Sequence, residues 1–398
     1  MDKIIQKRNF RSISILFGVW LFIYVYSCEI FPINAGHVIF GINIVFWCVH
    51  IKEIQNILRN KEILSISILW LFFFCANLFI VICNGQRVDY LFDIGRIAIQ
   101  IVSASLIIVL YYKCREKSFE EFIKSVVFIS ICQSIISLLA FFVPSIKCII
   151  CEIALNNNEA LRELIEFYRE FRYYGLADNL FFATPILQGT IGMIALYYYL
   201  ESKERLFLQA FVLDTITGAL NARTTYIVIA ACGCILLLTA IRKRYIKILS
   251  QSIIAWVSVY GVVMVWAYFF SPYDLRLVFD FVKAIMGQLV GKTVEGEYFD
   301  LINDFTLQTA QNYSTSTVEI GYLICVNNMG VVMTILLWGI CLYMLYLAHK
   351  KLEEKHKIVV VLLGVSLLVA GIKGLIIAYN AYTIILFAIC FMSYWQKE

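Results

Sequence analysis

Long apolar stretches separated by short polar connections dominate this chain. An α-helix needs about 20 apolar residues to cross a hydrocarbon core about 30 Å thick. The pattern predicts about twelve such spans. We place them near residues 13–33, 36–51, 63–83, 94–112, 122–143, 179–200, 206–221, 224–241, 250–270, 329–348, 358–372 and 379–395. The predicted fold class is therefore an all-α, polytopic membrane protein, in which helices satisfy their own backbone hydrogen bonds.

Two connections are much longer than the rest. They are residues 144–178, after the fifth predicted span, and residues 271–328, after the ninth. No linker rich in proline or serine divides the chain, so we interpret residues 1–398 as a single integral membrane domain with two long loops. Because long loops on a rigid scaffold commonly carry function, we expect the site there.

The basic residues give the predicted orientation. Lys3, Lys7, Arg8 and Arg11 precede the first span and no cleavage pattern follows it, which indicates an uncleaved signal anchor. With the N-terminus in the cytoplasm, the cytoplasmic segments hold 22 of 33 basic and 11 of 28 acidic residues. This agrees with the enrichment of Lys and Arg in cytoplasmic loops. We therefore predict an inner-membrane protein with both termini in the cytoplasm and both long loops in the periplasm.

Composition supports lipid as the natural solvent. The chain is 61% hydrophobic and 15% charged, with a mean hydropathy of +0.81. A soluble domain carries roughly a quarter charged residues. The net charge of +5 does not indicate a nucleic-acid partner, because the basic residues form short clusters between spans and not a continuous stripe.

Cysteine and histidine do not predict a metal or cofactor site. Most of the 13 cysteines lie inside apolar spans, where they act as small hydrophobic residues. Cys148 and Cys151 form a CxxC pair in the first long loop, and both a disulfide and an idle pair stay open. The pair lacks the His or second Cys pair of a zinc site. Nucleotide-binding, hydrolase and metalloprotease motifs are also absent from the sequence.

Arginines at the predicted outer face are the main candidates for binding chemistry. Residues 159–174 have an amphipathic helical pattern suited to the membrane surface, with Arg162, Arg169 and Arg172 on the polar face. Arg223 lies in the very short connection 221–225, with Asp214 as a candidate partner in the preceding span. Arginine binds phosphate with two parallel hydrogen bonds. The alternative interpretation of Arg223 is a snorkelling side chain that only marks the interface.

The plan of the chain resembles the Wzy-type O-antigen polymerases, which are related to the O-antigen ligases. About twelve spans, with long outer loops after spans five and nine, match that layout over the whole chain. Arg276 and Gly287 reproduce an Arg-x10-Gly pattern of polymerase loops. Residues 317–323, followed by Gly330, resemble the ligase pattern His-Asn-x-Tyr-Leu, with Glu319 at the position of the histidine. Arg223-Thr224-Thr225 resembles a Ser-Arg-Thr turn, and residues 175–179 resemble the glycine-containing start of the next span.

The resemblance implies a metal-independent glycosyltransferase without a cofactor. Donor and acceptor would be oligosaccharides on undecaprenyl pyrophosphate, joined at the periplasmic face. It implies Arg223 and Arg276 on the pyrophosphate, Arg172 or Arg169 on a donor or acceptor phosphate, and Glu319 as the base. Tyr313 and Tyr322 are candidate contacts to sugar or lipid. For Glu319 the alternative is an interfacial residue that caps the following helix together with Ser316 or Thr317.

Three other functions stay open. A flippase for lipid-linked oligosaccharides also has about twelve spans, but repeats and a charged central path are expected of a transporter. An O-antigen ligase would be expected to carry a histidine in the second long loop, and residues 271–328 contain none. A generic permease leaves the long loops unexplained. Candidate partners of a polymerase are membrane lipid, a chain-length regulator and a flippase.

Overall fold

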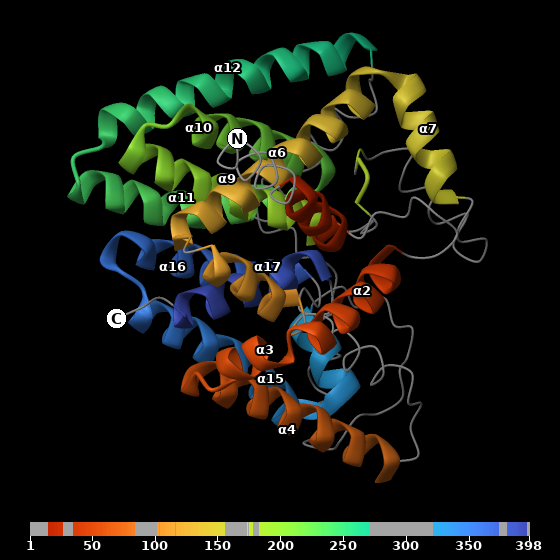
Figure 1. The fold of residues 1–398 in the computed structure, drawn as a ribbon. Coiled ribbons are helices and arrows are strands. Elements are labelled where there is room, and N and C mark those ends of the chain that lie inside the picture. Colours follow the sequence, from red (N-terminus) through yellow and green to blue (C-terminus); the bar gives the residue numbers. More distant parts are fainter. Residues whose placement is uncertain are drawn as a thin grey trace, which may run out of the picture.

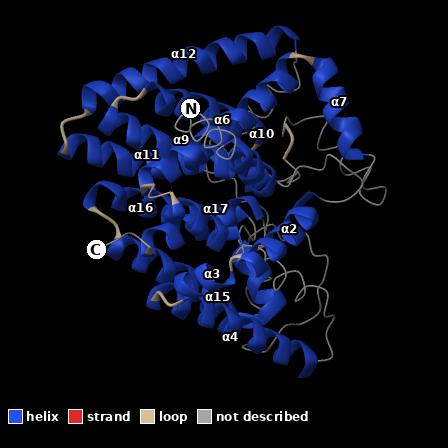
Figure 2. Ribbon diagram, viewed as in Figure 1, coloured by secondary structure: helices blue, strands red, loops and turns tan. Residues whose placement is uncertain are grey.

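The computed structural model describes most of the predicted membrane domain. The described residues are 15–26, 35–83, 102, 104–115, 117–155, 173, 175–177, 183–270, 321–373 and 380–395. In these residues the only regular secondary structure is helical, as Figure 2 shows. The prediction of an all-α fold is confirmed for this part of the chain.

Consecutive helices such as α9, α10, α11 and α12 are joined by short connections (Figure 1). Apolar helical stretches also cover Ile15–Tyr26 and Ala104–Cys114. The labelled helices are α2 (Ala35–Val49), α3 (Ile51–Leu58), α4 (Lys61–Cys83), α6 (Phe119–Phe142), α7 (Pro144–Leu155), α9 (Ala183–Ser202), α10 (Arg205–Asn221), α11 (Arg223–Arg242), α12 (Ile246–Phe270), α15 (Gly321–Lys351), α16 (Glu354–Lys373) and α17 (Asn380–Tyr394).

Six of the described helices are long and apolar enough to cross a membrane. A seventh would require α2 and α3 to count as one span, although the chain bends by 90° between them. The six segments are Lys61–Phe79, Phe119–Phe142, Thr224–Arg242, Ile246–Phe270, Gly330–Lys351 and Glu354–Ile372. The structure therefore shows a multi-pass, membrane-embedded type of protein, while the count of twelve spans stays a prediction.

Helices α9 and α12 show the two extremes of environment. Helix α9 contacts α6, α10, α11, α16 and α17, and almost all its side chains from Ala183 to Leu200 are buried. Helix α12 buries only Leu249, Ser252, Val263 and Ala267 among its 25 residues. Its exposed face is apolar, and Phe269 is 70% exposed. Such a large apolar face is suited to contact with lipid.

Glycines allow α9, α10 and α11 to approach one another closely. A Cβ atom on Gly218 of α10 would lie 2.8 Å from the carbonyl oxygen of Pro185 in α9 and 2.8 Å from Cγ2 of Thr225 in α11. A Cβ atom on Gly192 of α9 would lie 2.6 Å from Cγ2 of Thr215 in α10. Small residues of this kind are the usual means by which membrane helices pack tightly.

Gly218→Val is expected to destabilise the protein by about 1–3 kcal/mol, because the added atoms overlap two neighbouring helices. The thermal midpoint in one detergent, compared with wild type, measures this loss. Gly261→Val is the matched control, since no atom lies within 4 Å of a Cβ atom at Gly261 on α12. Equal midpoints for the two variants would contradict the close packing described here.

Turns that the sequence assigns to the cytoplasm meet at one end of the bundle. Contacts there link pairs of turns that are far apart in the sequence. They are Lys124 Nζ to Glu204 Oε1 at 2.8 Å, Lys243 Nζ to Glu201 Oε1 at 2.5 Å, Lys351 Nζ to Glu62 Oε1 at 2.9 Å, and Asn60 Nδ2 to the Tyr394 carbonyl at 3.0 Å. Exposed ion pairs contribute only about 0–1 kcal/mol each to stability. These contacts mainly show that the turns lie at the same end of the bundle. We call it the basic end.

Candidate functional site

The structure describes few of the side chains predicted for the site. Arg223 is the first residue of α11, and its backbone is described while its side chain is not. Tyr322 lies in the first turn of α15. The other predicted site residues lie outside the described residues: Glu319, Arg276, Arg172, Arg169 and Tyr313. The site can therefore be followed through the segments that border these positions.

A single extended residue joins α10 to α11 beside Arg223. Ala222, at φ −151° and ψ 135°, ends α10 and begins α11. Its N–H donates to the Gly218 carbonyl at 2.9 Å, and Thr225 Oγ1 donates to the same carbonyl at 2.9 Å. No side chain caps the start of α11. Uncapped N–H groups at a helix N-terminus favour anions, so this turn has the backbone chemistry for phosphate.

Asn221 fastens the end of the first long loop to this turn. Its Oδ1 accepts from the Tyr173 N–H at 2.6 Å, and its Nδ2 donates to the Tyr173 carbonyl at 3.0 Å. Nδ2 also donates to the carbonyl of Thr217 at 2.8 Å. Asn221 is 1% exposed. A buried amide with matched donors and acceptors fixes the two segments in one register, because leaving any of these groups unpaired costs about 1–3 kcal/mol.

The ring of Tyr173 is held as well. It lies edge-on to Phe141 at 4.9 Å between centroids, and Lys147 Nζ is 4.1 Å from its centre. Phe141 in turn packs against Trp266 of α12 at 5.1 Å. Lys147 belongs to α7, which begins the first long loop, and Tyr173 lies near the loop's end. Both ends of the loop therefore meet at the tip of α6.

Gly175 brings the chain down onto α6 after Tyr173. Its φ of +60° is in the left-handed region, which suits glycine. A Cβ atom there would lie 2.9 Å from Gln133 Nε2 and 3.0 Å from Ser137 Oγ. A larger residue would have both an unfavourable backbone and a steric overlap. The glycine in the motif at residues 175–179 thus has a physical role.

A buried polar cluster lies deeper in the bundle. Ser134 Oγ donates to Asp214 Oδ1 at 2.6 Å, lies 2.9 Å from Thr217 Oγ1, and accepts from Gln188 Nε2 at 3.1 Å. All four residues are at most 1% exposed, and their hydrogen bonds link α6, α9 and α10. Asp214 Oδ2 has no hydrogen-bond partner in the described part of the chain. Charged groups inside membrane domains are costly and commonly functional.

Asp214 is held by Ser134, whose hydroxyl donates to Asp214 Oδ1. The candidate pairing of Asp214 with Arg223 stays a prediction, because the Arg223 side chain lies outside the described part of the chain. Seven residues separate Asp214 from Asn221, which is about 10 Å along α10. Asp214 therefore lies below the turn and stabilises the packing of α10 on α6. Sequence spacing does not reveal this contact, because Ser134 is 80 positions away.

Tyr322 packs between α15 and α16. Its hydroxyl donates to the carbonyl of Leu368 at 2.8 Å, and its ring centroid is 4.6 Å from that of Trp338. A Cβ atom on Gly371 would lie 2.7 Å from both rings. Gly330, with φ 79° and ψ 166°, breaks α15 at the predicted mouth of the span. Residues 321–329, before this break, are helical, although the sequence assigned residues up to 328 to the second long loop.

Cys148 and Cys151 lie one turn apart on α7 as free thiols. In the described residues, no three His, Cys, Asp or Glu side chains gather in a way that could hold a metal ion. Sequence reasoning overlooked Tyr173 and Asn221. The available signals were weak: an Asn at the end of an apolar helix, and a Tyr between Arg172 and a glycine turn.

Known proteins give no family for this chain. No protein-family model matches the sequence, and neither a curated protein nor a solved structure matches it. The resemblance described above therefore depends on the chain's own motifs and layout.

Proposed function

We propose that this chain is an O-antigen polymerase, a metal-independent glycosyltransferase that joins undecaprenyl-pyrophosphate-linked glycans at the periplasmic face of the inner membrane. The observation that supports this most is the pair of hydrogen bonds between Asn221 and Tyr173. Tyr173 follows Arg172 directly in the chain, and Arg223 comes two residues after Asn221. Two segments expected to bind phosphate are thus tied together at one turn.

The proposed chemistry needs cations and one base. An acceptor hydroxyl attacks the anomeric carbon of the donor, the bond to pyrophosphate breaks, and the hydroxyl proton passes to a carboxylate. Arg223, Arg276 and Arg172 or Arg169 would stabilise the departing pyrophosphate, together with the uncapped start of α11. Glu319 would take the proton. Tyr313 and Tyr322 would contact sugar or lipid, Tyr322 through its ring, because its hydroxyl donates to the Leu368 carbonyl.

The orientation that we propose follows from the basic end. Helix α11 runs from Arg223 to Arg242, and Arg242 adjoins the Lys243 contact at the basic end. Twenty residues of helix extend for about 30 Å, close to the thickness of a hydrocarbon core. If the basic end is cytoplasmic, Arg223 faces the periplasm. We retain about twelve spans, two cytoplasmic termini and two periplasmic loops as parts of this proposal.

A deletion strain tests the function. Wild type, Arg276→Ala and Glu319→Ala would be returned at matched membrane abundance, and the lipopolysaccharide ladder compared. We expect wild type to restore long chains, while both variants leave core plus one repeat unit. If the deletion strain lacks even the single-unit band, the defect lies in export or ligation, and a flippase or ligase is the better assignment.

A further inference from the structure

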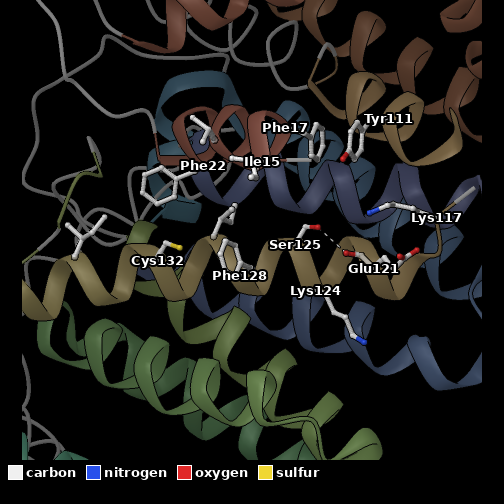
Figure 3. Close-up of a pocket in the computed structure, with 14 residues that line it drawn as sticks. Ile15, Phe17, Phe22, Tyr111, Lys117, Glu121, Lys124, Ser125, Phe128 and Cys132 are labelled. Atoms are coloured by element: carbon white, nitrogen blue, oxygen red, sulfur yellow. Dashed lines mark hydrogen bonds between the residues drawn. The ribbon is translucent and has the colours of Figure 1, made fainter. Parts of the chain in front are cut away.

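A groove of about 850 Å³ lies between the helical stretch Ile15–Tyr26 and α6, away from the proposed site (Figure 3). Figure 3 shows Phe22 and Cys132 toward one end of it and Tyr111 and Lys117 toward the other. Its lining is Ile15, Phe17, Gly18, Val19, Phe22, Tyr111, Lys117, Glu121, Lys124, Ser125, Phe128, Ile129, Cys132 and Ile136. The walls are apolar except at the end near Lys117.

The groove is long enough to hold a lipid chain that begins at the membrane surface. Along α6 its lining runs from Glu121 to Ile136, which is about 22 Å of helix. One leaflet contributes about 15 Å of hydrocarbon. Phe128 is 56% exposed and Val19 is 50% exposed, so apolar groups line a space open to the surroundings. In a membrane such a space is filled by hydrocarbon chains.

The polar end of the groove offers one available cation. Lys124 Nζ is bonded to Glu204 Oε1 at 2.8 Å and lies 3.4 Å from Glu120 Oε1. Glu121 forms a capping box with Ser118. The ammonium of Lys117 has no ion pair in the part of the chain that the structure describes. This end of α6 also belongs to the basic end of the bundle.

We propose that the groove binds an anionic glycerophospholipid, with one acyl chain along α6 and the headgroup phosphate beside Lys117. Basic pockets between membrane helices on the cytoplasmic side are suited to anionic headgroups. The chain's own N-terminal segment is a poorer occupant, because it carries Lys3, Lys7, Arg8 and Arg11 and would add positive charge next to Lys117. This lipid site is independent of the proposed polymerase reaction.

Gly18 provides a variant that fills the groove without disturbing packing. It lines the groove, and no atom lies within 4 Å of the position of a Cβ atom. Gly18→Leu would therefore occupy the space of a lipid chain, and it replaces glycine with a better helix former. Gly41→Leu is the matched control, because Gly41 of α2 is equally open but lies outside the groove.

The test uses the purified full-length protein in phosphatidylcholine nanodiscs that contain phosphatidylglycerol with a photoreactive acyl chain. After illumination, mass spectrometry would locate the labelled residues. We expect labelling along Phe128–Ile136, reduced by Gly18→Leu and retained in Gly41→Leu. Lys117→Gln should require roughly fivefold more phosphatidylglycerol for half labelling, the effect of one Lys at an anionic surface. Lys52→Gln, which changes an exposed lysine of α3, should leave the labelling unchanged.

Either of two results would overturn the proposal. The first is that Phe128–Ile136 are not labelled in wild type, or are labelled equally in wild type and Gly18→Leu. The other is a photoreactive phosphatidylcholine probe that labels the groove as strongly as phosphatidylglycerol and is indifferent to Lys117→Gln. Size-exclusion profiles of all variants show whether a loss of labelling comes from misfolding, and a misfolded Gly18→Leu leaves the Lys117→Gln comparison to decide.

Discussion

Arg223→Ala is expected to leave core plus a single repeat unit on the lipopolysaccharide, in cells that make normal amounts of the protein. Arg223 begins α11 at a turn whose N–H groups have no capping side chain. Removing one cation from a preorganised anion site commonly lowers the catalysed rate by about 10²–10³-fold. A reduction of this size would let single units be transferred to the core before they are joined to one another. Silver-stained lipopolysaccharide gels measure the result.

Two further variants make this prediction specific. Arg223→Lys keeps the charge but loses the planar fork that binds phosphate with two hydrogen bonds, so we expect shortened chains and not complete loss. Arg242→Ala removes an arginine from the opposite end of the same helix, at the basic end, and should leave the ladder normal. A normal ladder in Arg223→Ala at matched abundance would remove Arg223 from the proposed site.

Asn221→Ala is expected to release the Tyr173 segment from the bundle and to block polymerisation. The variant leaves the Tyr173 N–H and carbonyl without their amide partners, at a cost of about 1–3 kcal/mol each. Hydrogen exchange at residues 173–177 measures the release, and the lipopolysaccharide ladder measures the function. Asn221→Asp tests the same contact without changing the shape of the side chain. It places an acceptor opposite the carbonyls of Tyr173 and Thr217, so we expect the same release.

A control variant separates this effect from general instability. Asn43 of α2 accepts a hydrogen bond from Trp20 Nε1 at 3.1 Å and is 1% exposed. Asn43→Ala should lower the thermal midpoint without exposing residues 173–177 or shortening the glycan. If Asn221→Ala behaves in the same way as Asn43→Ala, the contact between Asn221 and Tyr173 serves stability alone.

Long apolar runs with clear end signals were the most predictable part of the fold. The predicted span 122–143 corresponds to α6, and 250–270 corresponds to α12. The earlier start of α6 follows from the capping box between Ser118 and Glu121. The predicted span 36–51 covers α2 and ends where α3 begins, but the 90° bend between the two helices was not predicted. Hydropathy alone does not show a bend that tertiary contacts decide.

Helix α7 shows a missed signal within a loop. We expected a helix at 159–174, of which the structure describes only Tyr173, outside any helix, whereas the described helix covers Pro144–Leu155. Proline is favoured at the first position of a helix, where its missing N–H costs nothing. The apolar residues that follow Pro144 also continue the character of α6. A start signal at residue 144 was therefore readable from the sequence.

The candidate site was predictable only where its parts are adjacent in the chain. Residues 221–225 stood out as a short polar connection between two apolar runs, and α10 and α11 do meet there. Asn221 and Tyr173 are 48 positions apart, and no local propensity connects them. The same holds for Asp214 and Ser134. Such contacts depend on how helices pack in three dimensions.

Reconstitution of the purified protein gives the most direct test of the polymerase proposal. Lipid-linked repeat units would be extracted from the deletion strain, so that their sugars need not be known, and added to proteoliposomes in the presence of EDTA. We expect glycans of two or more units, with release of one undecaprenyl pyrophosphate for each bond formed, and neither product with Arg223→Ala. Transfer of intact lipid-linked units across the bilayer without any new glycosidic bond would contradict the proposal and identify a transporter.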